Sequence, residues 1–161
     1  MKKIFLFITI ILSVASTAQV THISLKASGL TCSMCSNSIN KALKTLDFIS
    51  EVDADISTYM FEISFIPNRV VDLDLIKKKV EQAGFSVAEF VVTLMFDSVP
   101  VSNQQPVTIA GLSFLFIDTK SQLLNGVRKL KILDKGFVSA REYKTNAFPV
   151  SAAGTYNARI L

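Results

Sequence analysis

The alternation of apolar and polar residues predicts a strand followed by a helix near the start of the chain. Residues 20–28 place Thr21, Ile23, Leu25 and Ala27 on one side and polar residues on the other, as in a half-buried strand. From Ser36 the apolar spacing becomes helical, at Ile39, Ala42, Leu43 and Leu46. The segment that joins the two elements contains Gly29 and both cysteines of the chain.

The residues that follow predict a hairpin, a second helix and a last strand. Residues 48–52 and 58–66 are strand candidates, and the turn-like residues 53–55 lie between them. Asp72 can cap a helix with an apolar stripe at Leu73, Ile76, Val80 and Ala83, and Gly84 fits its C-terminal stop. Residues 85–91 supply another strand. The order strand, helix, strand, strand, helix, strand is the α+β, ferredoxin-like (βαββαβ) arrangement.

After residue 93 the helical periodicity disappears. Five strand candidates are separated by turn residues: 94–96, 107–118, 127–133, 136–141 and 156–161. Short strands at turn spacing predict a small all-β domain over residues 92–161, for which an OB-like barrel is our expectation. We expect this segment to serve in interaction with a partner that the sequence does not identify, or as a modified docking surface for the metal domain. The interval near residue 92 leaves little room for a flexible linker, so we expect the two domains to pack together.

The first 18 residues resemble an export signal. Lys2 and Lys3 precede an apolar run over residues 4–14, and Ser16 to Ala18 are small residues before Gln19. The run is shorter than a membrane-spanning helix. We therefore expect an exported, periplasmic or secreted protein with domains at 19–91 and 92–161, and with no stable membrane insertion after signal cleavage.

Charge supports the division into two domains. Residues 19–91 hold seven basic and nine acidic residues, whereas residues 92–161 hold eight and four. Neither imbalance forms the dense basic patch of a nucleic-acid-binding protein, so no nucleic acid is expected.

Cys32 and Cys35 are the chemically distinctive residues. Thiolates select soft ions such as Cu(I), and the start of a helix favours the anionic form of a nearby thiol. As a disulfide the pair would close a very small loop and would restrain the unfolded chain little. The pair is therefore interpreted as a metal site and not as a structural crosslink.

These residues give residues 20–91 a resemblance to the heavy-metal-associated domain, the module of soft-metal chaperones and of the N-termini of metal-transporting P-type ATPases. The family motif Gly-Met-Thr-Cys-x-x-Cys stands here as Gly29-Leu30-Thr31-Cys32-Ser33-Met34-Cys35. The resemblance implies that Cys32 and Cys35 bind the metal and that Leu30 takes the place of a methionine that packs beneath the loop. It also implies that Phe85, after Gly84, shields the site.

The resemblance implies a carrier that passes metal on by thiolate exchange, and not an enzyme. Two thiolates satisfy Cu(I), whereas structural Zn(II) takes four ligands, so copper is the first expectation. Hg(II) also prefers two thiolates, and periplasmic mercury-binding proteins belong to the same family; Hg(II) and Zn(II) stay open. The expected partners are a heavy-metal ion and a metal-transporting membrane protein or another metal-binding domain.

A Cys-x-x-Cys pair at a helix start is also the arrangement of thioredoxin-like enzymes, so an exported thiol-disulfide oxidoreductase is the alternative from another class. The absence of tryptophan and the predicted strand order argue against it. A third hypothesis is a metal sensor whose second domain reports to a partner.

Three further features have a functional and an ordinary interpretation. Met34 could lend a thioether to Cu(I), but it is favoured as an exposed loop residue. His22, the single histidine, is favoured as a surface residue. Lys77, Lys78 and Lys79 could meet an acidic partner, but a solvated helix face is favoured.

Overall fold

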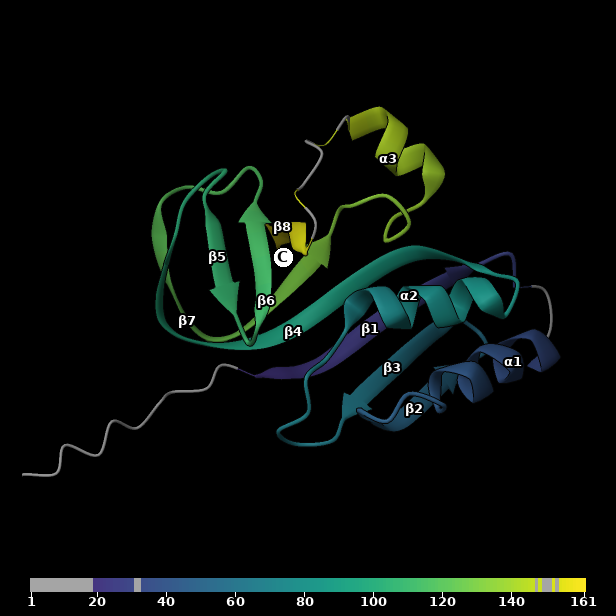
Figure 1. Ribbon diagram of the computed structural model, residues 1–161. Coiled ribbons are helices and arrows are strands. Elements are labelled where there is room, and N and C mark those ends of the chain that lie inside the picture. The colour runs from purple at the N-terminus through teal and green to yellow at the C-terminus, as the bar shows by residue number, and fades with distance from the viewer. Residues whose placement is uncertain (1–18, 31–32, 147, 149–151, 153) are drawn as a thin grey trace, which may run out of the picture.

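The computed structural model describes residues 19–30, 33–146, 148, 152 and 154–161. Within them eight strands form one sheet, flanked by three helices (Figure 1). In chain order the elements are β1 (Val20–Ser28), α1 (Ser33–Leu43), β2 (Ile49–Asp55), β3 (Met60–Phe65), α2 (Leu73–Gln82), β4 (Ser86–Val101), β5 (Pro106–Ile109), β6 (Leu112–Phe116), β7 (Gln122–Ile132), α3 (Ala140–Asn146) and β8 (Thr155–Ile160).

The predicted element order of residues 20–91 is confirmed. The strands lie in the order β2-β3-β1-β4, and each is antiparallel to its neighbour. Both helices pack on the same face, because the apolar residues of β1 alternate with polar ones and the buried stripes of α1 and α2 meet them. One detail is wrong: residues 53–55 continue β2, and the turn follows at residues 56–59.

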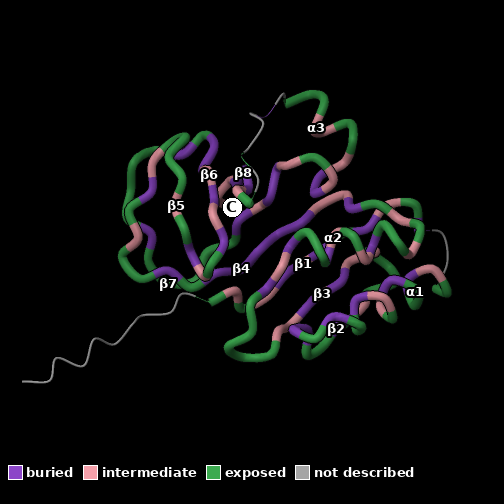
Figure 2. Tube along the Cα trace, in the orientation of Figure 1, coloured by how far each residue is buried: buried purple, intermediate pink, exposed green. Residues whose placement is uncertain are grey.

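The C-terminal strands continue the same sheet in the order β4-β7-β8-β6-β5. The expected domain boundary after residue 91 lies inside β4, which runs from Ser86 to Val101 and pairs with β1 on one side and β7 on the other. Figure 2 shows the buried positions running through β4 from one half of the molecule to the other. The two halves therefore share a sheet and a continuous core.

Two expectations for residues 92–161 are corrected. The segment is not all-β, because residues 136–141 form a turn and the start of α3 and not a strand. Ser139 caps this helix: its Oγ accepts from the N–H of Glu142 at 3.1 Å, as in the capping sequence Ser-x-x-Glu. Residues 107–118 are not one strand but two, since Ala110 and Gly111 both have positive φ, as a tight hairpin turn requires. An OB-like barrel is not confirmed.

The long aromatic side chains join the two halves. The Phe137 ring lies edge-on to Phe90 of β4, with centroids 5.0 Å apart, and edge-on to Tyr156 of β8 at 5.7 Å. The Tyr156 hydroxyl donates to Asp74 of α2 at 2.8 Å. Lys77 of α2 pairs with Asp74 at 2.6 Å and lies 4.5 Å from the centre of the Phe137 ring. Helix α2 of the N-terminal half is thus held in place by Phe137 and Tyr156 of the C-terminal half.

No helix of the described residues is long and apolar enough to cross a membrane.

Candidate metal-binding site

The cysteine motif lies where β1 ends and α1 begins. Gly29 has φ +85°, a left-handed conformation that favours glycine, and lets the chain leave the strand. Leu30 is buried in the core, which agrees with the packing role that the family resemblance implies. Thr31 and Cys32 lie outside the described residues, so the structure does not test Cys32 as a ligand.

The rest of the motif forms the first turn of α1, with Ser33, Met34 and Cys35 in sequence. Cys35 is half-buried and packs against the main core. Met34 is 79 % exposed, as expected of a loop-like position, and makes no shield for the site. The backbone N–H groups of this first turn have no partner within the helix and favour a negative charge beside them.

Phe85 lies against the base of this loop. The C-terminal cap of α2 places it there: the N–H of Gly84 donates to the carbonyl of Glu81 at 2.9 Å, and the N–H of Phe85 donates to that of Val80 at 3.2 Å. Gly84 takes φ +90° in this cap. A Cβ built on Gly29 would lie 3.9 Å from Cδ1 of Phe85. The ring is therefore close enough to exclude water from one side of the loop.

Three serines beside the site were not identified from the sequence as site residues. Ser28 and Ser86 share a hydrogen bond of 2.6 Å between their hydroxyls, which ties the end of β1 to the start of β4. Ser36 is 2 % exposed, and its hydroxyl has no hydrogen-bond partner in the described part of the chain. Ser36 lies on the same buried stripe of α1 as Ile39 and Leu43. Its burial could therefore have been predicted from its spacing in the helical pattern.

His22 lies on the other face of the sheet. Its ring contacts Glu62, which also accepts from Ser24 at 2.6 Å. The described residues contain no group of three or more His, Cys, Asp or Glu side chains that could hold a metal ion. Lys77 is engaged with Asp74, which leaves Lys78 as the exposed lysine of the predicted basic run.

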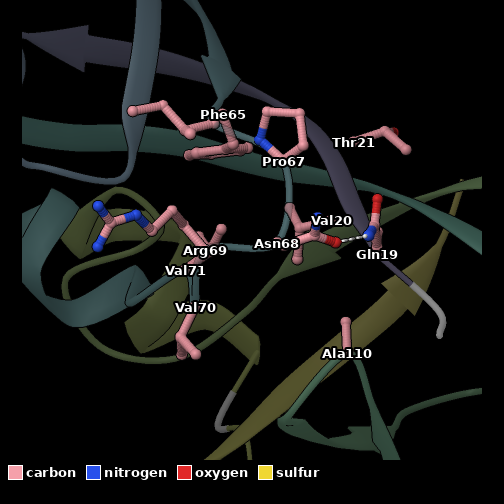
Figure 3. Close-up of a pocket in the computed structure, with 11 residues that line it drawn as sticks. Gln19, Val20, Thr21, Phe65, Pro67, Asn68, Arg69, Val70, Val71 and Ala110 are labelled. Atoms are coloured by element: carbon pink, nitrogen blue, oxygen red, sulfur yellow. Dashed lines mark hydrogen bonds between the residues drawn. The ribbon is translucent and has the colours of Figure 1, made fainter.

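A cavity of about 440 Å³ opens at the opposite end of β1 (Figure 3). Val20, Phe65, Pro67 and Val71 line it together with the pair Gln19 and Asn68, whose side-chain amides are joined at 3.2 Å. It contains no cysteine or histidine, so its chemistry is not that of a soft-metal site.

Comparison with known proteins identifies a family for the N-terminal half of the chain. Residues 24–86 match the model of the heavy-metal-associated domain. The "Probable copper-transporting ATPase HMA5" of Arabidopsis thaliana is 38 % identical over 60 residues, which are 37 % of this chain and 6 % of that protein. The "Probable copper-exporting P-type ATPase" of Archaeoglobus fulgidus is 31 % identical over 78 residues, or 48 % of this chain and 10 % of that protein.

Among solved structures, the yeast copper transporter domain Ccc2a is 30 % identical, with a TM-score of 0.37; the match covers 42 % of this chain and 90 % of that domain. The similarity thus concerns the N-terminal half of this chain and a tenth or less of the ATPases.

Proposed function

Because residues 24–86 are a heavy-metal-associated domain, we propose that this protein binds Cu(I) through Cys32 and Cys35 and passes it on by thiolate exchange. The observation that carries the proposal is the family match over a strand-to-helix loop with the motif Gly29 to Cys35. The two ATPase relatives, which are named for copper, favour copper over Hg(II) and Zn(II).

The surroundings of Cys35 suit transfer. Cys35 is half-buried against apolar residues, and the ring of Phe85 lies at the base of the loop. Met34, next to Cys35 in the first turn of α1, is exposed, so this turn can be reached by a partner. In exchange, a partner sulfur bonds to the ion before a donor sulfur leaves, so the ion is never released to solvent.

We further propose that the protein is exported after cleavage between Ala18 and Gln19. The basic residues, the apolar run and the small residues of the first 18 positions support this. The acceptor or donor is then a metal-transporting membrane protein or another metal-binding domain.

The test is a Cu(I) titration of the reduced protein against a competing chelator. We expect the wild-type protein to retain one Cu(I) and the Cys32→Ser, Cys35→Ser double variant to lose it. Ser38→Ala, in the same helix but exposed, is the matched control and should bind as the wild type does. Equal retention by the wild type and the double variant would refute the site, and retention of Hg(II) but not Cu(I) would change the metal.

A further inference from the structure

The face of the sheet opposite α1 and α2, called here the open face, is covered by α3 beside Lys131 and carries an exposed apolar patch next to that helix. Met95 of β4 and Val127 of β7 are register partners, so their side chains lie side by side on it. Lys129 follows Val127 two positions on, on the same face. The N–H of Leu161 donates to the carbonyl of Lys129 at 3.0 Å, which places Leu161 beside this lysine.

The three apolar side chains of the patch are well exposed: Met95 by 46 %, Val127 by 51 % and Leu161 by 62 %. Lys129 lies among them, is exposed, and makes no ion pair within the described residues. Two further cations of this face are paired, Lys131 with Glu142 and Arg159 with Asp118. Arg128 belongs to the other face of β7 and donates to the carbonyl of Val127 at 3.1 Å. A lone cation surrounded by exposed apolar groups calls for an occupant that is both apolar and anionic.

We propose that this patch, formed by Met95, Val127, Lys129 and Leu161, binds the surface of an anionic phospholipid bilayer. The three apolar side chains enter the headgroup region while Lys129 contacts lipid phosphates. The charge of the whole chain favours this orientation, because residues 92–161 have a net charge of +4 and residues 19–91 have −2. The positive half turns toward the membrane and the negative half away from it.

Two other occupants fit the patch less well. In a symmetric pair of copies joined through it, Lys129 would face its own copy, and like charges across an interface are unfavourable. An acidic protein would be expected to place an anchor side chain in a pocket. The patch residues line neither the cavity near Gln19 nor the hollow between Pro100 and Leu123.

Membrane contact through the patch leaves the cysteine loop accessible. The loop lies at the end of the sheet where Ser28 pairs with Ser86, and Met95 is nine positions further along β4. At about 3.3 Å per residue the patch is about 30 Å from that end. The cysteine loop would therefore lie outside the membrane contact, where it stays accessible to the exposed domains of membrane proteins.

Co-sedimentation of the processed chain, residues 19–161, without metal tests this directly, because the apolar leader is absent and the result does not depend on copper binding. The probes are vesicles of phosphatidylcholine alone and vesicles that contain about one quarter phosphatidylglycerol. We expect binding to the anionic vesicles that is lost at high salt. Absence of binding, or equal binding to both vesicles, would overturn the proposal.

Charge-reversal variants test whether Lys129 lies at the contact with the vesicle. Lys129→Glu should weaken the partition coefficient about tenfold, because it reverses a charge at the lipid surface. Lys120→Glu, an exposed lysine elsewhere in the same half, makes the same change in net charge and should have an effect of less than about twofold. Equal losses would show that only net charge matters and would overturn the site.

A second comparison of variants tests the apolar side chains of the patch. Met95→Ser with Val127→Ser should reduce binding several-fold, whereas Val70→Ser, at an 81 % exposed position of the N-terminal half, should not. Circular dichroism of each variant checks that it is folded. Sedimentation velocity supplies the last outcome: a concentration-dependent dimer that Lys129→Glu abolishes would assign the patch to a second copy and refute the membrane proposal.

Discussion

Replacement of Phe137 by alanine should destabilise both halves of the molecule together. Phe137 is 1 % exposed and contacts Phe90, Tyr156 and Lys77, which belong to three different elements. Truncation of a buried phenylalanine costs about 3–5 kcal/mol, and each edge-on aromatic pair adds about 0.5–1.5 kcal/mol. We expect a loss of about 4–5 kcal/mol, a large part of the roughly 5–15 kcal/mol that stabilises a typical domain.

Urea unfolding followed by circular dichroism measures this loss, and hydrogen exchange with mass spectrometry locates it. Because β4 runs through both halves, we expect one transition and faster exchange in β2 and β3 as well as in β7 and β8. Phe137→Leu should cost less, about 1–3 kcal/mol, since it keeps much of the buried volume but loses both edge-on aromatic pairs. Leu123→Ala, at a 63 % exposed position, is the control and should change stability by less than about 0.5 kcal/mol.

A different outcome would refute the reasoning. If Phe137→Ala produced two transitions and accelerated exchange only beyond residue 101, the halves would be separate folding units. The shared sheet would then be a contact between two domains and not a common core.

Four shorter predictions concern single side chains. Asp72→Ala should lower stability by about 1 kcal/mol in thermal unfolding, because Asp72 Oδ1 accepts from the N–H of Leu75 at 2.9 Å and caps α2. Asp72→Asn should retain most of the stability that this cap contributes. Ser36→Ala should raise the stability of the metal-free protein by about 1 kcal/mol, because it removes a buried hydroxyl that has no partner among the described residues; a loss of stability instead would show that the hydroxyl makes a hydrogen bond. Hydrogen bonds from Ser57 and Thr58 lower the pKa of Asp55 to about 2, so this carboxylate stabilises the folded state above its ordinary pKa and the contribution is lost as the pH falls toward 2; carbon NMR titration of Asp55 checks the value, and an ordinary pKa would contradict these bonds. Burial and the nearby Asp74 carboxylate raise the pKa of Tyr156 above its ordinary value, so Tyr156 should stay protonated at pH 10 in an ultraviolet titration, and its ionisation at that pH would contradict the bond to Asp74.

The N-terminal half could be predicted from the sequence because its signals are local and repeated. Alternation at Ile23 and Leu25 predicts β1, and the spacing of Ile76 and Val80 with the cap at Asp72 predicts α2. The family resemblance implied that Phe85 lies near the loop, and the structure places its ring beside Gly29. Its role as a shield stays a prediction. The role of Cys32 and Cys35 as ligands stays a prediction.

The structure of the C-terminal half is harder to predict from the sequence, because it depends on short motifs and on pairing between residues far apart in the chain. The capping sequence Ser139 to Glu142 predicts α3, but it spans one turn and lies in a segment whose residues also alternate. The predicted domain boundary at residue 91 divides β4, because the continuous apolar run of this strand does not indicate where a domain would end. The pairing of β8 between β7 and β6, one antiparallel and one parallel, depends on residues far apart in the chain.

The C-terminal strands also change what the edges of the sheet can do. In a four-stranded βαββαβ module β4 is an edge, with unpaired backbone groups that can receive another strand; here β7 pairs along most of it. The edges that remain are β2 and β5. β2 carries the exposed charges of Glu51 and Asp53, and β5 is four residues long and begins with Pro106, so both discourage strand addition. Extension of the sheet to a partner is therefore disfavoured at either edge, so we expect this protein to recognise partners through side chains and not through the backbone of an edge strand.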